Sequence, residues 1–243
     1  MAQEGGINPD VDGPFDISDF DDPAQAEEAR LDLGSVLIPA PETGQLQVEL
    51  TQTGAPSAVW VITPNGRYTI AAYAAPKSAG LWREVATELA DALRTDSAKV
   101  SIETGPWGRE VVGAGDNGTV RFIGVDGYRW MIRCVINGPD ETIAALADEA
   151  RNALADTVVR RGDTPLPVRT PLQVELPAAM TAQLRAAAAQ QAATLQQQGA
   201  VQPEGAVPPE GAVPPEGEPP QPVARRAAPG SAMQQLRTTM GGA

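Results

Sequence analysis

The sequence predicts an α+β fold: an antiparallel sheet built from hairpins, with two main helices packed on it. Two turn signals predict the hairpins. The pairs Asn65-Gly66 and Asp126-Gly127 each lie between runs rich in β-branched and aromatic residues, which is typical of tight β-turns. Apolar residues recur every three or four positions after Ser78 and again after Asp140, which predicts two helices. Hairpin connections make adjacent strands antiparallel, so the class is α+β.

The elements follow each other in the order strands, helix, strands, helix. The predicted strands span 46–50, 58–63, 67–74, 99–103, 110–112, 119–125, 128–136 and 172–176. Ser78 is the predicted cap of the first helix, whose apolar stripe is Leu81, Trp82, Val85, Leu89 and Leu93. Asp140 is the predicted cap of the second helix, whose stripe is Ile143, Leu146, Ala150, Leu154 and Val158.

The strands at 119–125 and 128–136 carry large apolar side chains on both faces. One face holds Phe122, Met131 and Val135, and the other holds Ile123, Val125, Trp130, Ile132 and Ile136. Because apolar surface is unfavourable in water, such a sheet needs cover on both sides, or a partner.

Composition divides the chain into four parts. Residues 1–32 hold ten carboxylates and one arginine, which predicts an acidic, disordered arm. Residues 33–177 form the predicted α+β core, and 178–198 is rich in alanine and glutamine, which favours a helix. Residues 199–243 repeat Glu-Gly-Ala-Val-Pro-Pro, which favours an extended, disordered tail.

The charge balance and residue usage bear on several function classes. The net charge of −13 opposes binding to phosphate backbones, so nucleic-acid binding is not expected. The chain has no polybasic patch, no apolar run long enough to cross a membrane and no signal-peptide pattern at residues 1–13. With a single cysteine, Cys134, these features favour the cytoplasm and no membrane association.

The sequence contains few of the residues and motifs that are typical of catalytic and metal-binding sites. The chain has no histidine, the commonest general base and metal ligand, and it shows no phosphate-binding glycine loop or nucleophile elbow. We therefore predict no catalytic residues, metal site or cofactor. Carboxylate pairs such as Asp116 with Asp126, or Glu103 with Glu110, have the chemistry for acid–base work, but nothing in the sequence fixes their spacing. Cys134 belongs on an apolar strand face, in a structural role.

Four basic residues are candidates for binding a ligand. A two-residue turn at Asp126-Gly127 would place Gly124 opposite Arg129 and Val120 opposite Arg133, so that both arginines share a face and could clamp a carboxylate or phosphate. Pairing with acids of the covering helices is the favoured alternative. Lys77 and Arg83 flank the start of the first helix, where backbone N–H groups attract anions. A simple capped helix start is favoured there.

Two apolar groups in the predicted tails are candidates for contacting a protein partner. Phe15, Ile17 and Phe20 lie among carboxylates in the acidic arm, and Met233, Leu236 and Met240 share one side of a short amphipathic end. Packing of Phe15 and Phe20 onto the protein's own core is the favoured alternative for the first group, and plain disorder for the second.

Five phrases together resemble an uncharacterised actinobacterial family, a domain of unknown function. They are Gly13-Pro14-Phe15-Asp16, Arg30-Leu31-Asp32-Leu33-Gly34-Ser35, Ala74-Ala75-Pro76-Lys77-Ser78 with Gly80-Leu81-Trp82, Gly105-Pro106-Trp107-Gly108 and Gly124-Val125-Asp126-Gly127-Tyr128-Arg129-Trp130. The resemblance covers roughly residues 13–177. It implies one cytoplasmic domain with variable tails and no established catalytic residues.

The sequence thus favours a protein-interaction or adaptor module of the cytoplasm that is not an enzyme, with an unknown protein partner. One alternative is a small-molecule or nucleotide-phosphate binder, with or without enzymatic activity, which would use Lys77, Arg83, Arg129 and Arg133. The other is a chaperone-like homodimer that would hold a client on the apolar sheet.

Overall fold

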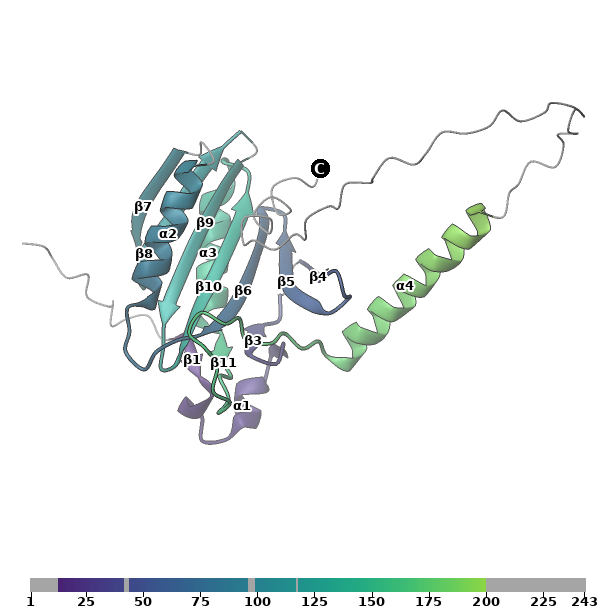
Figure 1. Ribbon diagram of the computed structural model, residues 1–243, viewed down its shortest axis with the longest axis horizontal. Coiled ribbons are helices and arrows are strands. Elements are labelled where there is room, and N and C mark those ends of the chain that lie inside the picture. The colour runs from purple at the N-terminus through teal and green to yellow at the C-terminus, as the bar shows by residue number, and fades with distance from the viewer. Residues whose placement is uncertain (1–12, 42–43, 96–98, 117, 200–243) are drawn as a thin grey trace, which may run out of the picture. The chain divides into compact units, whose positions relative to one another are not determined.

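The computed structural model describes residues 13–41, 44–95, 99–116 and 118–199. They form a seven-stranded antiparallel sheet, a smaller four-stranded sheet and four α-helices, which confirms the predicted α+β class (Figure 1). The order of the large sheet is β4-β5-β6-β10-β9-β8-β7. Its strands are β4 (Gln45–Leu50), β5 (Pro56–Thr63), β6 (Gly66–Ala74), β7 (Lys99–Gly105), β8 (Gly108–Gly115), β9 (Gly118–Asp126) and β10 (Trp130–Gly138).

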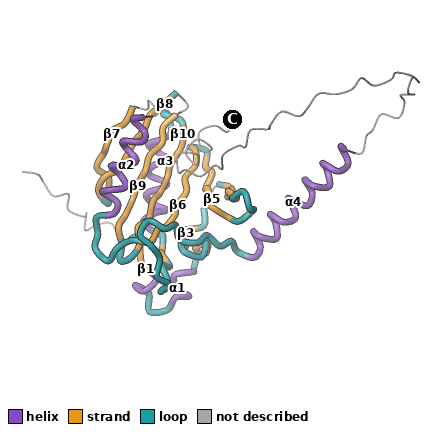
Figure 2. Tube along the Cα trace, viewed as in Figure 1, coloured by secondary structure: helices purple, strands orange, loops and turns teal. Residues whose placement is uncertain are grey.

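Two helices cover opposite faces of this sheet. Helix α2 (Leu81–Thr95) packs Leu81, Trp82 and Leu93 against Val111, Phe122 and Met131. Helix α3 (Ile143–Ala155) packs Leu146, Ala150 and Leu154 against Ile123, Ile132 and Ile136. Figure 2 shows the strands as one layer between the two helices. The central hairpin is apolar on both faces, as predicted, and of the two expected arrangements, cover on both sides or a partner, the fold provides cover on both sides.

The four-stranded sheet gathers segments from both ends of the fold. Its order is β1-β11-β3-β2. The strands are β1 (Phe15–Asp16), β2 (Arg30–Asp32), β3 (Val36–Pro39) and β11 (Val158–Val159), with the 3₁₀ helix η1 (Ile17–Asp19) and helix α1 (Pro23–Glu27) between β1 and β2. The predicted disordered arm is therefore corrected for residues 13–32, which fold with the core. Residues 1–12 lie outside the described part of the chain.

The central hairpin turns later than its sequence suggested. Asp126 pairs with Met131, and Arg133 lies opposite Gly124 rather than Val120. The turn therefore occupies 127–130, with a hydrogen bond of 2.9 Å from the Gly127 N–H to the Trp130 carbonyl. Burial of the Trp130 indole explains the shift, because a Cβ on Gly127 would lie 2.2 Å from that ring. Packing against the Trp130 indole therefore shapes the turn, and the two-residue turn signal of Asp126-Gly127 does not take such packing into account.

Three smaller predictions are also corrected. Neither Ser78 nor Asp140 caps a helix: Asp126 caps α2 from the neighbouring hairpin, and Asp140 instead accepts a hydrogen bond from Thr119 Oγ1 at 2.6 Å. The predicted strand at 172–176 is absent, since the segment 171–174 makes only isolated bridges to Tyr73 and Gly34.

Helix α4 (Ala178–Gly199) confirms the helix predicted from alanine and glutamine content. It runs across the boundary between two compact units, which falls between Leu184 and Arg185. Within the described residues no helix has both the length and the apolar character needed to cross a membrane. Residues 200–243, which include most of the predicted tail, lie outside the described part.

Candidate functional site

Three loops meet where β6 leads into α2. They are residues 75–80, 127–129 and 160–170, and we call them the loop junction. Arg129 is their centre, because its carbonyl accepts hydrogen bonds from the Ala75 N–H at 2.9 Å and from Arg161 Nε at 3.0 Å. The Arg169 N–H also donates to the Ala74 carbonyl over 2.7 Å. These bonds hold loops from three distant parts of the sequence together.

Exposed apolar side chains concentrate at the loop junction. Tyr128 is 59% exposed, Val168 49% and Leu166 38%. Two other large apolar side chains of the described residues, Leu50 and Ile102, are as exposed, and both lie on sheet edges. Apolar surface left in water on loops that hydrogen bonds hold in place is typical of a recognition surface.

The loop junction is also basic, although the chain as a whole is acidic. It carries Lys77, Arg129, Arg160, Arg161 and Arg169 against one acid, Asp163. Arg160 pairs with Asp32 and Glu27, and Arg169 pairs with Glu84 and Glu88. Within the described residues no carboxylate pairs with the remaining three, and Arg161 donates instead to the carbonyls of Arg129 and Thr164. Three positive charges are therefore left for an external acidic group.

Two residues of the loop junction hold an unfavourable backbone conformation. Arg129 has φ 64° and Arg169 has φ 70°, in the left-handed region. Such a conformation costs an L-residue with a Cβ on the order of 1 kcal/mol, and glycine avoids that cost. Strained non-glycine residues cluster at functional sites, which adds weight to this surface.

The predicted anion site at the start of α2 is occupied by the protein itself. The Asp126 carboxylate accepts hydrogen bonds from the Gly80 N–H at 2.8 Å and from the Trp82 N–H at 2.9 Å. An external anion would bind these same N–H groups, at the positive end of the helix dipole. Lys77 and Arg83 are exposed nearby in the chain, but the helix N-terminus is already capped.

The two arginines of the central hairpin are not brought together as predicted. Arg129 lies in the turn, whereas Arg133 lies in β10 between Ala71 and Gly124. The Arg133 guanidinium donates a hydrogen bond to the Tyr73 hydroxyl and lies 4.9 Å from the centre of that ring. The predicted shared clamp is therefore wrong, because the turn moved the register by four positions.

A buried ion network joins residues that no sequence pattern connects. The Glu110 side chain, 2% exposed, accepts hydrogen bonds from Arg121 at 2.6 Å and from Arg151 at 2.8 Å. Hydrogen bonding to Glu110 is the main cause that raises the pKa of Arg151. Arg121 also pairs with Glu103 at 2.8 Å. The carboxylate pair Glu103 and Glu110 is thus neutralised by arginine, not poised for proton transfer.

One sequence signal for this network exists. A Cβ on Gly105 would lie 1.9 Å from a carboxylate oxygen of Glu110, so this glycine leaves room for the buried acid. The glycine belongs to the Gly105-Pro106-Trp107-Gly108 phrase. The space that the buried Glu110 carboxylate needs therefore explains the glycine at position 105 of this phrase.

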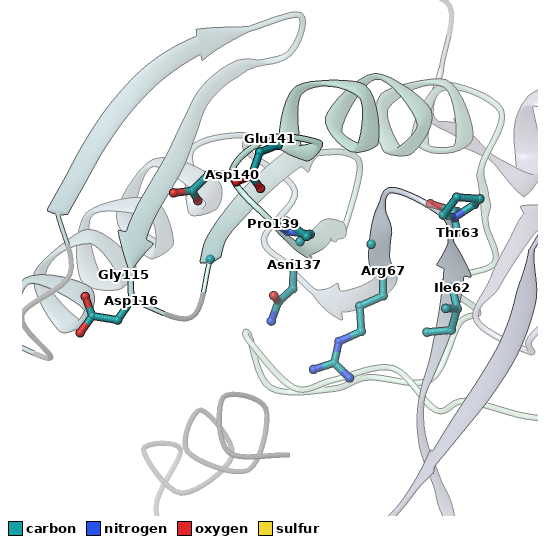
Figure 3. A pocket seen from close by; sticks show the side chains of 13 residues that line it. Ile62, Thr63, Arg67, Gly115, Asp116, Asn137, Pro139, Asp140 and Glu141 are labelled. Carbon is teal, nitrogen blue, oxygen red and sulfur yellow. The ribbon is translucent and has the colours of Figure 1, made fainter. Parts of the chain in front are cut away.

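A cavity of the described structure lies at the opposite end of the large sheet from the loop junction. Its volume is about 600 Å³, and its polar lining includes Arg67, Asp116, Asn137, Asp140 and Glu141. Figure 3 shows Asn137 between Arg67 and the carboxylates of Asp116 and Asp140. The four predicted ligand-binding cations are not among its lining residues. No cluster of three or more potential metal ligands occurs in the described residues.

The predicted partner-binding aromatics contribute to a small core of their own. Phe15, Ile17 and Phe20 are half-buried and pack against Ala26, Leu37 and Val158. The rings of Phe15 and Phe20 meet edge to face at 5.9 Å. This arrangement agrees with the alternative in which they pack on the protein's own core. Met233, Leu236 and Met240 lie outside the described residues.

The fold and its loop junction define an α+β protein with a candidate recognition surface on its loops. The chain belongs to the family described as "Protein of unknown function (DUF3710)", whose model matches residues 13–183. This confirms the resemblance at the level of a family of unknown function, while an actinobacterial source stays a prediction. No curated protein matches the chain.

Two solved structures are similar to part of the chain. One is a crystal structure from Bacteroides thetaiotaomicron VPI-5482, with 14% identity and a TM-score of 0.39, covering 65% of this chain and 57% of that one. The other is the solution structure of cyanobacterial PsbP (CyanoP) from Synechocystis sp. PCC 6803, with 9% identity and a TM-score of 0.36. It covers 54% of this chain and 94% of that one. The chain therefore spans just over half the length of the first.

Proposed function

We propose that this protein is a non-catalytic interaction module, an adaptor of the cytoplasm, that binds a protein partner through the loop junction. One observation carries the proposal: Tyr128, Leu166 and Val168 are exposed on the same hydrogen-bonded loops as three basic residues without a carboxylate partner in the described chain. An acidic segment with apolar side chains has the matching chemistry.

The placement of the acidic candidates supports a binding role over a catalytic one. Asp126 caps α2, and arginines neutralise Glu103 and Glu110. Cys134 is buried in the core, where burial and the charge of Glu110 raise its pKa, so it is not an activated thiolate. Asp126, Glu103, Glu110 and Cys134 therefore each have a structural task.

Neither alternative gains support from the geometry. A small-molecule site built on Lys77, Arg83, Arg129 and Arg133 would need them to line a cavity, and the cavity between Arg67 and Asp140 has none of them in its lining. A client-holding sheet would need an uncovered apolar face, but α2 and α3 cover the apolar hairpin on both sides.

The test is affinity capture with full-length protein from the native cytoplasm, using two variants of the loop junction. Tyr128→Ala removes exposed apolar surface, and Arg129→Glu reverses one charge. Arg94→Glu is the matched control, because Arg94 is exposed at the far end of α2 and pairs with Asp91. We expect the parent and Arg94→Glu to capture a partner that both junction variants fail to capture. The purified partner should likewise bind the parent and Arg94→Glu more tightly than it binds either junction variant. Identical capture by all four proteins would overturn the proposal.

A further inference from the structure

The strand β7 (Lys99–Gly105) is an unprotected edge of the large sheet. Within the described residues its one strand neighbour is β8, and the pairing runs without interruption from Lys99 opposite Ala114 to Gly105 opposite Gly108. In an antiparallel edge strand the N–H and C=O groups of every second residue point away from the neighbouring strand, and those of β7 face no strand of the described fold. Such a row of unpaired groups is a template for another strand.

The other edge of the same sheet is built differently. The pairing of β4 with β5 shifts register between Glu49 and Leu50, and β5 begins with Pro56. Irregular pairing of this kind bends an edge and discourages another strand from adding to it. In β7 there is neither proline nor a register shift, so the two edges are not equivalent.

The side chains of β7 alternate between an apolar row and a polar row. Val100 and Ile102 share one face, and Ile102 is 45% exposed. Lys99, Ser101 and Glu103 share the other face, where all three are exposed. Lys99 has no carboxylate partner among the described residues, while Glu103 uses Oε2 for Arg121 and has Oε1 3.5 Å from Ser101 Oγ.

We propose that β7 pairs antiparallel with β7 of a second copy of this chain, about a two-fold axis at Ser101. In that register Lys99 lies opposite Glu103 of the second copy, and Val100 lies opposite its Ile102. The symmetry makes each of these pairs twice. Opposite charges and apolar side chains that face each other directly across antiparallel strands are stabilising. The large sheets of the two copies then form one continuous sheet.

Charge complementarity selects this register over the next one. An axis at Ile102 would place Lys99 opposite Gly105 and Ser101 opposite Glu103, so the lysine would again lack a partner. In the proposed dimer Ser101 therefore lies directly opposite Ser101 of the second copy.

The first test is cross-linking of full-length protein under mild oxidation. In the proposed register a Ser101→Cys substitution brings two thiols face to face, since directly opposed Cβ atoms lie about 4.5–5.5 Å apart. We expect a disulfide-linked dimer from this variant, and none from Ile102→Cys or from the exposed control Ser57→Cys. The native Cys134 is buried, so it does not compete. A dimer from Ile102→Cys in place of Ser101→Cys would overturn the register.

The second test is the mass in solution by sedimentation over a concentration series. The unmodified chain is expected to dimerise, and Lys99→Glu is expected to raise the dimer dissociation constant about tenfold, because it places like charges opposite each other twice. Ile102→Lys should weaken the dimer further. Lys77→Glu is the matched charge change at the loop junction and should leave the dimer intact. A monomer at every concentration would overturn the proposal without bearing on the loop junction. Equal loss of the dimer with Lys77→Glu would also overturn it, because it would place the contact at the loop junction and not at β7.

Discussion

Trp130 and Asp16 join two segments that lie 114 residues apart, because the indole Nε1 donates a hydrogen bond of 2.7 Å to Asp16 Oδ2. A second indole repeats the arrangement, since Trp107 Nε1 donates to the Gly13 carbonyl at 2.8 Å. Both tryptophans come from the turns at one end of the large sheet. Residues 13–16 are therefore anchored to that sheet, and this is why the acidic segment folds despite its charge.

The first prediction is that Asp16→Ala lowers the free energy of unfolding by about 1–3 kcal/mol, because the substitution leaves the buried Trp130 N–H without its acceptor. Asp16 also accepts a hydrogen bond from the Ser18 N–H, which caps η1. Urea denaturation measures the change. Asp21→Ala is the control, since Asp21 is exposed, and it should stay within about 0.5 kcal/mol of the parent. Equal stability of the two variants would contradict the anchoring of this segment.

Local patterns predicted the large sheet well and the long-range contacts poorly. Alternation of apolar residues predicted the strands around Asn65, and helical spacing predicted the apolar faces of both main helices. Both patterns depend only on residues that are close in sequence. The acidic segment was misjudged because charge density is a local property, whereas the acceptor role of Asp16 depends on Trp130. The register of the central hairpin was wrong for a similar reason, as the buried Trp130 indole decides where the turn closes.

The candidate site was predicted in part. The phrases that contain Lys77 and Arg129 lie at the loop junction, but their sequence gave no sign that residues 160–170 join them. The Glu110 network was missed because burial of a charge depends on partners from β9 and α3, here Arg121 and Arg151. A long-range pair of this kind has no local pattern.

The second prediction concerns this buried network. Glu110→Ala should lower the free energy of unfolding by about 3–5 kcal/mol, because it leaves two largely buried guanidinium groups without their shared carboxylate. Thermal or urea unfolding measures the loss. Asp148→Ala removes the exposed partner of the same Arg151 and should change stability by less than about 1 kcal/mol. Similar losses in both variants would show that burial of Glu110 is not what matters.

The third prediction is a fall in stability at alkaline pH that depends on Tyr68. Burial, followed by the charges of Cys134 and Glu149, raises the pKa of Tyr68 to about 12, whereas an unfolded chain has its tyrosines near 10. Between these values the unfolded chain loses the proton first, so the free energy of unfolding decreases as pH rises. Below pH 10 this stabilising contribution of Tyr68 is fully present.

Urea midpoints at pH 8, 10 and 11 test this, with Tyr68→Phe as the comparison. The variant should show a shallower fall between pH 10 and 11, because phenylalanine cannot titrate. Tyr73→Phe is the matched control, and it should keep the slope of the parent. A slope unchanged by Tyr68→Phe would show that other groups govern the alkaline loss.

The fourth prediction is that Cys134 is inert to thiol reagents in the folded protein. The side chain is fully buried, and burial followed by the charge of Glu110 raises its pKa, so neither access nor thiolate is available. At pH 8 a colorimetric disulfide reagent should react with the thiol only after denaturant is added. As a control, Ser57→Cys should add one thiol that reacts at once in the folded protein. Immediate reaction of the parent would contradict the placement of Cys134 in the core.

The last prediction separates stability from binding at the centre of the loop junction. Arg129→Gly should raise the free energy of unfolding by about 1 kcal/mol, because glycine adopts φ 64° without the steric penalty of a Cβ. The same substitution should weaken capture of the partner, because it removes a positive charge and its side-chain contacts. Arg129→Lys keeps both the strain and the charge, so its stability and its binding should stay close to those of the parent. Urea denaturation and binding to the purified partner measure the two effects on the same samples. If Arg129→Gly gained stability and bound the partner as before, the strained arginine would have no role in recognition, and the loop junction would lose its central residue.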